Sequence, residues 1–477
     1  MVSEVSGFGS SARAAALEAL CRAERGKGFL RDALHSVFDE TGLPERDRAL
    51  ATQLATGVVR HRRTLRLILS HLRGRRKRAS AIQPVLLAIL ELGAFQLTFL
   101  DRVPAYAAVN EAVEAARATV RGRRADRTAA FVNAMLRSLE RLVDHRDPAG
   151  RPARNAVPHP DGGIVRLKAA VLPDPADGRP TFLGAAYSYP DWLVARWLKA
   201  FVDEAETVCR WNNRRPRTFA RVNPMRHDAE ELLRALQAEA PSVHPGPRAG
   251  SLDVSDLPAA RLGALVREGV LTVQDPSAMA AVEALAPAAG EAVLDLCASP
   301  GTKTTQMAEA MGDQGCVIAC DRSEEKLRPL RDVVTQRCLK SVAVCLSGRL
   351  DEVTPKDGFD AAIVDVPCSN TGVLARRVEA RWRLRPADLE ELPRRQSELL
   401  ARAAEQVRPG GRLIYSTCSL ESEENDDVIR GFLGERADWV LRRRELILPS
   451  PDHDGAYWAL LHRQQMGSDP HFSRGGF

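Results

Sequence analysis

Apolar residues recur every three or four positions through the first third of the chain. The pattern runs through SARAAALEALCRAERG, ERDRALATQLATGVVRHRRTLRLILSHL, IQPVLLAILELGAFQLTFL and AYAAVNEAVEAARATV, all within residues 11–145. This spacing places apolar side chains on one face of a helix. Pro84 and Pro104 stand near expected helix starts, where a missing N–H costs little. We therefore expect an all-α domain over residues 1–145.

The helical pattern stops after residue 145. Residues 146–182 are rich in proline, glycine and aspartate, as in DPAGRPARNAVPHPDGG and LPDPADGRP, which is typical of a linker. A helix resumes at YPDWLVARWLKAF, TFARVNP predicts a strand, and DAEELLRALQAEA predicts a helix opened by Asp228. We expect a small α+β subdomain over residues 183–285.

A third pattern begins at residue 286. Short apolar runs alternate with helical stretches in AVLDLCASPGTKT, CVIACDRSEEKL, VAVCLSG, AAIVDVPC and RLIYSTCS. This alternation is typical of a doubly wound parallel sheet. We expect a Rossmann-like α/β domain over residues 286–465 and a tail over 466–477. The expected fold class is therefore multidomain, and the length of 477 residues agrees with about three domains.

The charge of the chain is uneven, although its net value is only +6. Residues 1–150 carry 25 Lys and Arg against 16 Asp and Glu, including the runs RGRRKR (73–78) and RGRR (121–124). A basic helical domain suggests a polyanionic partner such as RNA. The alternative is a solvated, arginine-rich surface without such a partner.

The nine cysteines are scattered without paired spacing, which favours free thiols in a reducing cytoplasm. Cys316 and Cys320 have no second pair or nearby histidine, so we expect no metal site. The start MVSEVSGFGSS lacks the pattern of a signal peptide, and no apolar run reaches membrane-spanning length. We expect a cytoplasmic protein without a membrane partner, and take a monomer as the working expectation.

The ends of the expected strands carry the candidate chemistry, because ligands bind at the carboxyl edge of such a sheet. The first strand is expected to end at Asp295, and the LCASPGTKT turn follows it. The second strand ends at Asp321, where a carboxylate is well placed to bind ribose hydroxyls. The turn lacks both GxGxxG and the phosphate-binding GxxxxGK[ST] motif. A ligand with a ribose and no phosphate, such as S-adenosylmethionine, fits these residues.

Two Cys-Ser pairs follow two further strands, in DVPCSNTG and STCS. If the strand order is 3-2-1-4-5, these strands are neighbours and Asp365, Cys368 and Cys418 converge beside the cofactor. A thiolate that adds to C6 of cytosine makes C5 nucleophilic enough to accept a methyl group, and a carboxyl group can assist at N3 or the amine. Single cysteines at strand ends more often serve packing. We assign that role to Cys297, Cys316, Cys320, Cys338 and Cys345.

The motifs DLCASPGTKT, DVPCSNTG and YSTCSLESEEN resemble those of the RNA cytosine-C5 methyltransferases. VPAYAAVNEAVEAAR and FVNAMLRSLER are similar to the NusB-type helical domain that precedes the methyltransferase in RsmB-type (Fmu, Sun) bacterial 16S rRNA enzymes. RVNP, VQDPSA and DGAYWALLHR resemble further segments of that family. The resemblance implies a NusB-like RNA-binding domain over 1–145, a class I methyltransferase domain over 286–465, and small-subunit ribosomal RNA as partner.

The resemblance also implies the role of each site residue. Cys418 would be the nucleophile that adds to C6, and Cys368 would assist release of the product. Asp365 would face both the cofactor and the base. The residues implied in binding S-adenosylmethionine are Cys297, Ala298, Ser299, Pro300, Gly301, Thr302, Lys303, Asp321, Ser347 and Asp365.

Three positions depart from the family pattern. Thr302 replaces a glycine, Ser347 replaces an aspartate expected near the adenine, and Ser422 replaces a proline. None of them is a candidate catalytic residue, so we expect activity to be retained. The alternatives are a non-catalytic RNA-binding or antitermination-like factor, and a methyltransferase acting on another RNA. A DNA cytosine-C5 methyltransferase would use only the cysteine after the strand-four proline and would not need Cys418.

Overall fold

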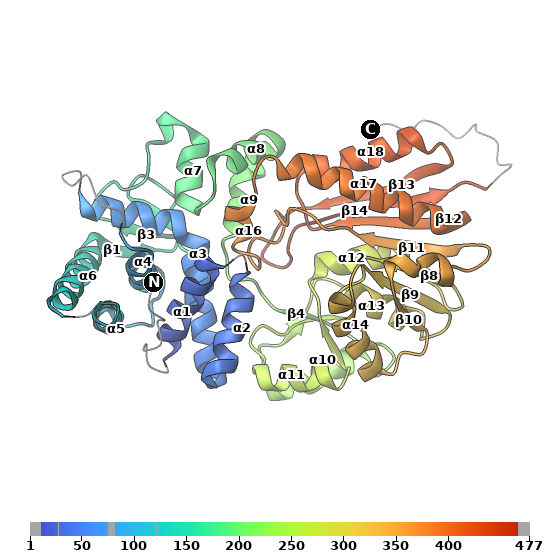
Figure 1. Cartoon of the computed structure of the whole chain (residues 1–477), viewed down its shortest axis with the longest axis horizontal. Helices are drawn as coiled ribbons and strands as arrows, with labels where there is room; N and C mark the ends of the chain where they lie inside the picture. The colour runs from blue at the N-terminus through green and yellow to red at the C-terminus, as the bar shows by residue number, and fades with distance from the viewer. Residues whose placement is uncertain (1–10, 27, 75–81, 121, 466–477) are drawn as a thin grey trace. The chain divides into compact units, whose positions relative to one another are not determined.

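The computed structural model describes residues 11–26, 28–74, 82–120 and 122–465 (Figure 1). Its contacts divide the chain into two compact units, Met1–Arg215 with Leu374–Arg383 (unit 1) and Pro216–Val373 with Leu384–Phe477 (unit 2). Most of RGRRKR and the first residue of RGRR lie outside the described residues. Within the described part, no helix is both long and apolar enough to cross a membrane.

Helices form the first part of unit 1, as the apolar spacing predicts. Ser11 begins the first of them, because its hydroxyl accepts a hydrogen bond from the Ala14 N–H at 3.2 Å. The helices then pack around a helix that is apolar on nearly every side and lies in the interior. They are α1 (Ala12–Arg25), α2 (Leu30–Thr41), α3 (Glu45–Arg73), the central α4 (Pro84–Phe99), α5 (Ala105–Ala118) and α6 (Arg123–Leu142).

The structure differs from the sequence expectation over residues 146–182, where we expected a linker. A small antiparallel sheet in the order β1-β3-β2 occupies much of this region, with strands β1 (Val143–Asp147), β2 (Ala156–Pro158) and β3 (Ile164–Leu167). Its apolar side chains are buried, while Gly162 and Gly163 take positive φ in the turn between β2 and β3. The proline and glycine residues therefore mark the turns of a sheet.

The next helices also belong to unit 1, although we expected them to open the α+β subdomain. They are α7 (Arg179–Tyr187), α8 (Asp191–Phe201) and α9 (Ala205–Trp211), with 3₁₀ turns at Pro175–Asp177 and Val202–Glu204. Trp197 on α8 and Tyr189 before it are almost completely buried and pack edge to face, with ring centroids 5.3 Å apart. Their apolar surface is thus buried within unit 1 rather than against the following sheet.

Residues 374–383 pack in unit 1, although they follow the second candidate motif in the sequence. Arg381 on the short helix α16 (Ala380–Arg383) has an exposure of 0%. It donates to Asn213 Oδ1 at 2.5 Å and to the carbonyl oxygens of Asn212 and Leu374 at 3.0 Å. Burial lowers the pKa of this guanidinium. The segment is therefore tied to unit 1 by a deeply buried cation.

Unit 2 contains a seven-stranded sheet in the order β10-β9-β8-β11-β12-β14-β13. The first five strands are parallel and confirm the expected order 3-2-1-4-5, while β14 and β13 add an antiparallel edge. The strands are β8 (Ala292–Leu296), β9 (Cys316–Asp321), β10 (Val342–Leu346), β11 (Phe359–Asp365), β12 (Val407–Thr417), β13 (Trp439–Ile447) and β14 (Ala456–Arg463).

Helices cover both faces of this sheet, which confirms the expected Rossmann-like architecture (Figure 1). One core joins apolar residues of α17 and α18 to the sheet, and a second joins those of α12 and α13 to the opposite face. The helices of this domain are α12 (Pro276–Leu285), α13 (Thr302–Ala310), α14 (Glu324–Arg337), α15 (Leu350–Val353), α17 (Asp388–Gln406) and α18 (Asp426–Glu435), with 3₁₀ turns at Ser347–Arg349 and Ser422–Glu424.

A smaller sheet precedes the large one within unit 2. Its order is β5-β6-β4-β7, formed by β4 (Phe219–Val222), β5 (His244–Pro245), β6 (Ser251–Asp253) and β7 (Leu271–Val273), and it packs with α10 (Ala229–Glu239) and α11 (Ala259–Arg267). Asp228 caps α10 by accepting from Glu230 N and Glu231 N, as expected. Arg221 on β4 and Arg337 on α14 both bind the buried Glu309 carboxylate of α13, which joins this subdomain to the large sheet.

Candidate active site

The candidate residues gather at one edge of the large sheet. Strands β8, β9, β11 and β12 are parallel neighbours, so their carboxyl ends meet at that edge. Asp321 is the last residue of β9, Asp365 is the last of β11, and Cys418 follows β12 directly. In the register of the sheet, Asp365 pairs with Ser416, two positions before Cys418. The topology therefore brings two motifs about fifty residues apart into contact.

The two thiols lie against each other. The Cys368 and Cys418 sulfur atoms are 2.9 Å apart, and both cysteines are free. The Cys418 N–H also donates to Cys368 Sγ at 3.3 Å, and Cys418 Sγ lies 3.4 Å from Asn370 Oδ1. Asn370 is held in turn by its own amide, which donates to the Cys368 carbonyl at 2.8 Å. The loops that follow β11 and β12 therefore place the two sulfur atoms in contact at the same edge of the sheet.

The electrostatic surroundings of the two sulfurs differ. The hydrogen bond to Cys418, together with burial, raises the pKa of Cys368 well above its ordinary value. Cys368 therefore stays a thiol and can donate a hydrogen bond to the Cys418 sulfur. Lys303 supplies a positive charge within electrostatic reach of Cys418. The hydrogen-bond partners of the Cys418 sulfur are Cys368 and Asn370.

Asp365 is fixed by two donors. Lys303 Nζ lies 2.6 Å from its Oδ2, and the Ser416 hydroxyl donates to its Oδ1 at 2.8 Å. Burial by itself lowers the pKa of Lys303, but the charge and hydrogen bond of Asp365 outweigh it and the pKa is raised. The ammonium group is therefore retained, and the carboxylate points from β11 toward the loop that begins α13.

Residues 297–301 join β8 to α13 and include Ala298, Ser299 and Pro300. Gly301 has φ 108°, and a Cβ on it would lie 2.5 Å from Leu330 Cδ1, so glycine is required there. Thr302 is the first residue of α13. Its backbone is helical, which is why a side chain is tolerated at this departure from the family pattern. Burial raises the pKa of Cys297 to about 12, so it packs as a neutral thiol.

Asp321 lies beside this loop and is buried. Its Oδ2 accepts the Ser299 N–H at 3.3 Å, its Oδ1 accepts the Arg322 N–H at 2.7 Å, and Lys326 Nζ lies 3.3 Å away. These donors hold a carboxylate at the end of β9. Ser347 is half-buried at the end of β10, where its carbonyl accepts a hydrogen bond from Arg402.

Asp295 near the end of β8 is a further buried carboxyl group. Thr304 donates to its Oδ2 at 2.6 Å, and its Oδ1 has no hydrogen-bond partner among the described residues. Burial raises the pKa of Asp295 to about 7, against a smaller opposing effect of the Thr304 hydrogen bond. The group is thus close to half-protonated near neutral pH.

The sequence analysis missed residues that position the two cysteines. Glu424 is 0% exposed, and its Oε1 accepts from the Ser369 N–H at 2.9 Å and from the Gln396 amide at 2.8 Å. Its Oε2 accepts from the Ser419 hydroxyl, so one carboxylate ties both thiol loops together. The sequence shows adjacent glutamates, Glu423 and Glu424, and nothing in their pattern tells which one is buried. Ser416 and Asn370 were also missed, because no local sequence pattern shows which polar residue will contact Asp365 or Cys418.

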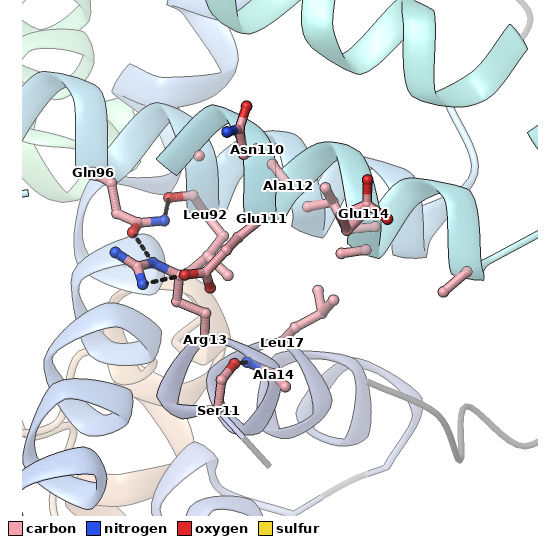
Figure 2. Close-up of a pocket in the computed structure, with 14 residues that line it drawn as sticks. Ser11, Arg13, Ala14, Leu17, Leu92, Gln96, Asn110, Glu111, Ala112 and Glu114 are labelled. Atoms are coloured by element: carbon pink, nitrogen blue, oxygen red, sulfur yellow. Dashed lines mark hydrogen bonds and ion pairs between the residues drawn. The ribbon is translucent and has the colours of Figure 1, made fainter. Parts of the chain in front are cut away.

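A separate, largely apolar pocket of about 540 Å³ lies among α1, α4 and α5 (Figure 2). Arg13 crosses it and donates to Gln96 Oε1 at 2.5 Å and to Glu111 Oε1 at 2.6 Å. None of the site residues that the sequence predicts lines this pocket. The candidate chemistry therefore belongs to unit 2.

Three family models match successive parts of the chain. They are described as the NusB family (residues 10–141), the RsmF/B-like ferredoxin-like domain (189–251) and 16S rRNA methyltransferase RsmB/F (282–461). They confirm the resemblance that the sequence motifs showed. The ferredoxin-like match falls largely on the subdomain that we expected to be α+β.

Comparison with whole proteins agrees with the matches to the family models. The probable ribosomal RNA small subunit methyltransferase B of Bacillus subtilis (strain 168) is 32% identical over 434 residues, 90% of each chain. Ribosomal RNA small subunit methyltransferase B of Cronobacter sakazakii is 32% identical over 399 residues, 83% of each chain. Among solved structures, the crystal structure of PH0851 superposes with a TM-score of 0.73 at 23% identity, covering 95% of this chain and 99% of that one. The chain is a methyltransferase that belongs to the ribosomal RNA small subunit methyltransferase B family.

Proposed function

We propose that the chain transfers a methyl group from S-adenosylmethionine to C5 of a cytosine in small-subunit (16S) ribosomal RNA. The observation that carries the proposal is the pair of sulfurs 2.9 Å apart, on neighbouring strands beside the Lys303–Asp365 pair. C5 of cytosine is a poor nucleophile until another nucleophile adds to C6. The names of the relatives support RNA of the small ribosomal subunit as the substrate.

The cofactor proposal rests on the fit of the loop and strand ends. Leu330 leaves no room for a Cβ at Gly301, so the turn that precedes α13 carries no side chain at that position, and the buried Asp321 offers a carboxylate to a ribose. Residues 297–303, Asp321 and Asp365 would hold S-adenosylmethionine, which supplies an electrophilic methyl group. Ser347 would stand near its adenine, where it offers a hydroxyl in place of a carboxylate.

The two cysteines would act in sequence. Cys418, with Lys303 near it, would add as a thiolate to C6, and Asp365 would orient the base through N3 or the amine. After methylation a water molecule takes the C5 proton, the C5–H electron pair forms the C5=C6 double bond, and the Cys418 sulfur leaves C6 with its bonding electron pair. The high pKa of Cys368 keeps a proton on that thiol, which can then donate to the departing thiolate. This division of roles gives a reason for two thiols in one site.

Binding of the cofactor can be tested separately from methyl transfer. We expect Asp321→Ala to weaken S-adenosylmethionine binding at least about tenfold in calorimetry, because a buried hydrogen bond to a charged group contributes about 1.5–3 kcal/mol. Asp332→Ala, an exposed position on α14, is the matched control and should bind as the wild type does. Equal affinity of the Asp321 variant and the wild type would remove this residue from the ribose site.

The reaction itself is tested by incubating the protein with unmodified 16S ribosomal RNA and S-adenosylmethionine, followed by bisulfite sequencing. We expect one cytosine to become resistant to bisulfite conversion in the wild-type reaction, and none in the Cys418→Ser reaction. The same map made on RNA from cells with and without the protein should show the same position. Methyl incorporation without a resistant cytosine would contradict the C5 assignment.

A further inference from the structure

Unit 1 contains a polar cavity of about 440 Å³, distant in sequence from the cysteine motifs. Its walls come from α3, the turns of the small β1–β3 sheet, the end of α7, and α9. Lining side chains that can form hydrogen bonds include His61, Arg151, His159, Tyr187, Glu206 and Arg210. A cavity of this size can enclose a small organic group.

His61 is the most informative residue of this cavity. It is 1% exposed, and neither of its ring nitrogens has a hydrogen-bond partner among the described residues. Its ring stacks on Phe99, with centroids 4.4 Å apart and planes 29° apart. Burial, with the nearby charge of Arg60, lowers the pKa of His61 well below its ordinary value. The cavity therefore presents a neutral imidazole with one donor and one acceptor, both unused.

His159 lies in the same cavity wall. Its Nδ1 accepts the Asp161 N–H at 3.1 Å, and burial lowers its pKa, so the neutral ring carries its proton on Nε2. That Nε2 is buried without a well-aligned acceptor among the described residues, and the Phe99 backbone carbonyl interacts with the ring. An unsatisfied buried polar group costs about 1–3 kcal/mol, so the unpaired imidazole of His61 indicates a missing partner.

The cavity has a basic side. Arg151 and Arg210 line it and are exposed. Arg210 and Arg214 lie over the ring of Trp211, at 5.0 and 4.2 Å from its centroid. Glu206 lines the cavity as well and accepts the Tyr187 hydroxyl at 3.0 Å. Guanidinium groups on an aromatic surface are a common setting for single-stranded RNA.

These features define the ligand. A neutral imidazole with both nitrogens unpaired is satisfied by a partner that offers both an acceptor and a donor. No cluster of three or more His, Cys, Asp or Glu in the described part of the chain is arranged to hold a metal ion. The edge of a nucleobase carries donors and acceptors side by side and is flat enough to lie against stacked rings, and its phosphate would be attracted to the arginines.

We propose that this cavity binds one unpaired nucleotide of the RNA, with its base toward His61 and His159 and its phosphate at Arg151 and Arg210. The site would hold the substrate at a position other than the target cytosine. The proposal rests on the proposed function for the identity of the ligand as RNA. It assigns a specific recognition role to unit 1, beyond general attraction by its positive charge.

Binding can be observed directly in the full-length protein. Each of the four ribonucleoside 5′-monophosphates, added at millimolar concentration, is followed by the ring ¹⁵N signals of the histidines. We expect at least one nucleotide to shift the His61 and His159 signals, which are assigned by His61→Phe and His159→Phe. If none of the four nucleotides shifts either signal, the proposal is overturned.

Affinity for RNA provides the second test. His61→Phe keeps an aromatic ring against Phe99 but removes both nitrogens, and we expect it to weaken RNA binding about fivefold while thermal stability is unchanged or higher. Arg210→Gln should weaken binding more than Arg141→Gln, which removes the same charge from an exposed position of unit 1 outside the cavity. Equal RNA affinity of folded His61→Phe and wild type would overturn the proposal.

The same samples separate this inference from the proposed function. Methyl transfer to RNA is measured at saturating RNA, where the cavity variants should retain the wild-type rate because they leave unit 2 unchanged. Nucleotide-dependent histidine shifts in a protein that methylates no cytosine would contradict the proposed function alone. Methylation with wild-type RNA affinity in all cavity variants would contradict the cavity alone.

Discussion

Two sulfur atoms in contact raise the question of which one is the nucleophile. Their environments are unequal, because Cys368 is held as a thiol by burial and its hydrogen bond, whereas Cys418 lies within reach of the Lys303 charge. A thiol that keeps its proton can act as a proton donor but is a poor nucleophile. This asymmetry agrees with the proposal that Cys418 is the nucleophile and that Cys368 assists release.

This inequality predicts different behaviour for the two alanine variants. Cys418→Ala should lose methylation completely and form no covalent adduct with RNA. Cys368→Ala should still attack and methylate, and then release the product slowly, so that a protein–RNA band persists on a denaturing gel in the presence of cofactor. An adduct trapped only in Cys418→Ala would mean that the roles are reversed. Full methylation by both variants would reduce the cysteines to packing residues.

Asp295 predicts a pH dependence of stability. Its pKa is about 7 in the folded protein and near 3.8 otherwise, so the folded state retains a proton that the unfolded state releases. Its contribution to stability is therefore full below pH 3.8 and is lost as the pH rises to about 7, by at most about 4 kcal/mol. Asp295→Asn should remove this slope, as urea unfolding across that range would show.

The control for this prediction is Asp332→Asn, which changes an exposed carboxylate on α14. Its stability curve should run parallel to that of the wild type throughout the pH range. If Asp295→Asn also ran parallel to the wild type, the Asp295 carboxyl group would have the same pKa in the folded and unfolded states.

At the scale of elements, a buried ion cluster joins the small sheet to the methyltransferase sheet. Arg337 Nη1 lies 2.5 Å from Glu309 Oε1, and Arg221 binds the other carboxylate oxygen. Arg337 also donates to the Leu271 carbonyl of β7 at 3.2 Å. The negative charge of Glu309 thus balances two buried guanidinium groups. Arg221 belongs to the small sheet, and Arg337 belongs to a helix of the methyltransferase domain.

Removing that carboxylate should be costly. We expect Glu309→Gln to lower the free energy of unfolding by about 3–5 kcal/mol, because it leaves two buried cations without their counter-ion. Guanidinium chloride unfolding followed by tryptophan fluorescence measures the change. Glu352→Gln breaks an exposed pair with Arg349 and should leave the free energy of unfolding almost unchanged. Similar effects of the two substitutions would mean that the cluster does not hold the junction.

At the scale of the whole molecule, the boundary between units does not follow the sequence. Residues 374–383 continue from the Cys368 loop, yet their contacts are with unit 1. Trp382 Nε1 donates to the Val59 carbonyl at 2.9 Å, and Arg60 donates to the Ala375 carbonyl at 2.7 Å. The N–H of Leu30 donates to Glu379 at 3.0 Å. The helical domain therefore also supports a segment of the methyltransferase sequence.

This arrangement predicts two effects of removing residues 1–182. RNA binding should weaken and depend less steeply on salt, because basic helices are lost. The free energy of unfolding should also fall, by at least about 2 kcal/mol, since Trp382 and Ala375 lose their hydrogen-bond partners. Binding at several salt concentrations and calorimetric unfolding test the two effects. An unchanged salt slope would mean that these helices do not touch phosphates, and unchanged stability would mean that residues 374–383 need no support.

Local patterns in the sequence determined most of the elements and identified the candidate site residues. Apolar spacing of three to four residues specifies α1–α6, and the alternation of short apolar runs with helices specifies a parallel sheet, because both depend only on which side chains can be buried together. That topology requires Asp365, Cys368 and Cys418 to meet at one edge. The candidate residues could be named from sequence because their types and strand-end positions are themselves the signal.

Contacts between distant segments were decided by the tertiary structure alone. No local pattern specifies that Glu424 is buried while Glu423 is only half-buried, or that Lys303 pairs with Asp365. The sheet formed within residues 143–167 likewise depends on partners that are distant in the sequence. The same holds for Arg381 and for the unpaired ring of His61. Burial and charge compensation are properties of the three-dimensional neighbourhood, so they become defined only when the chain has folded.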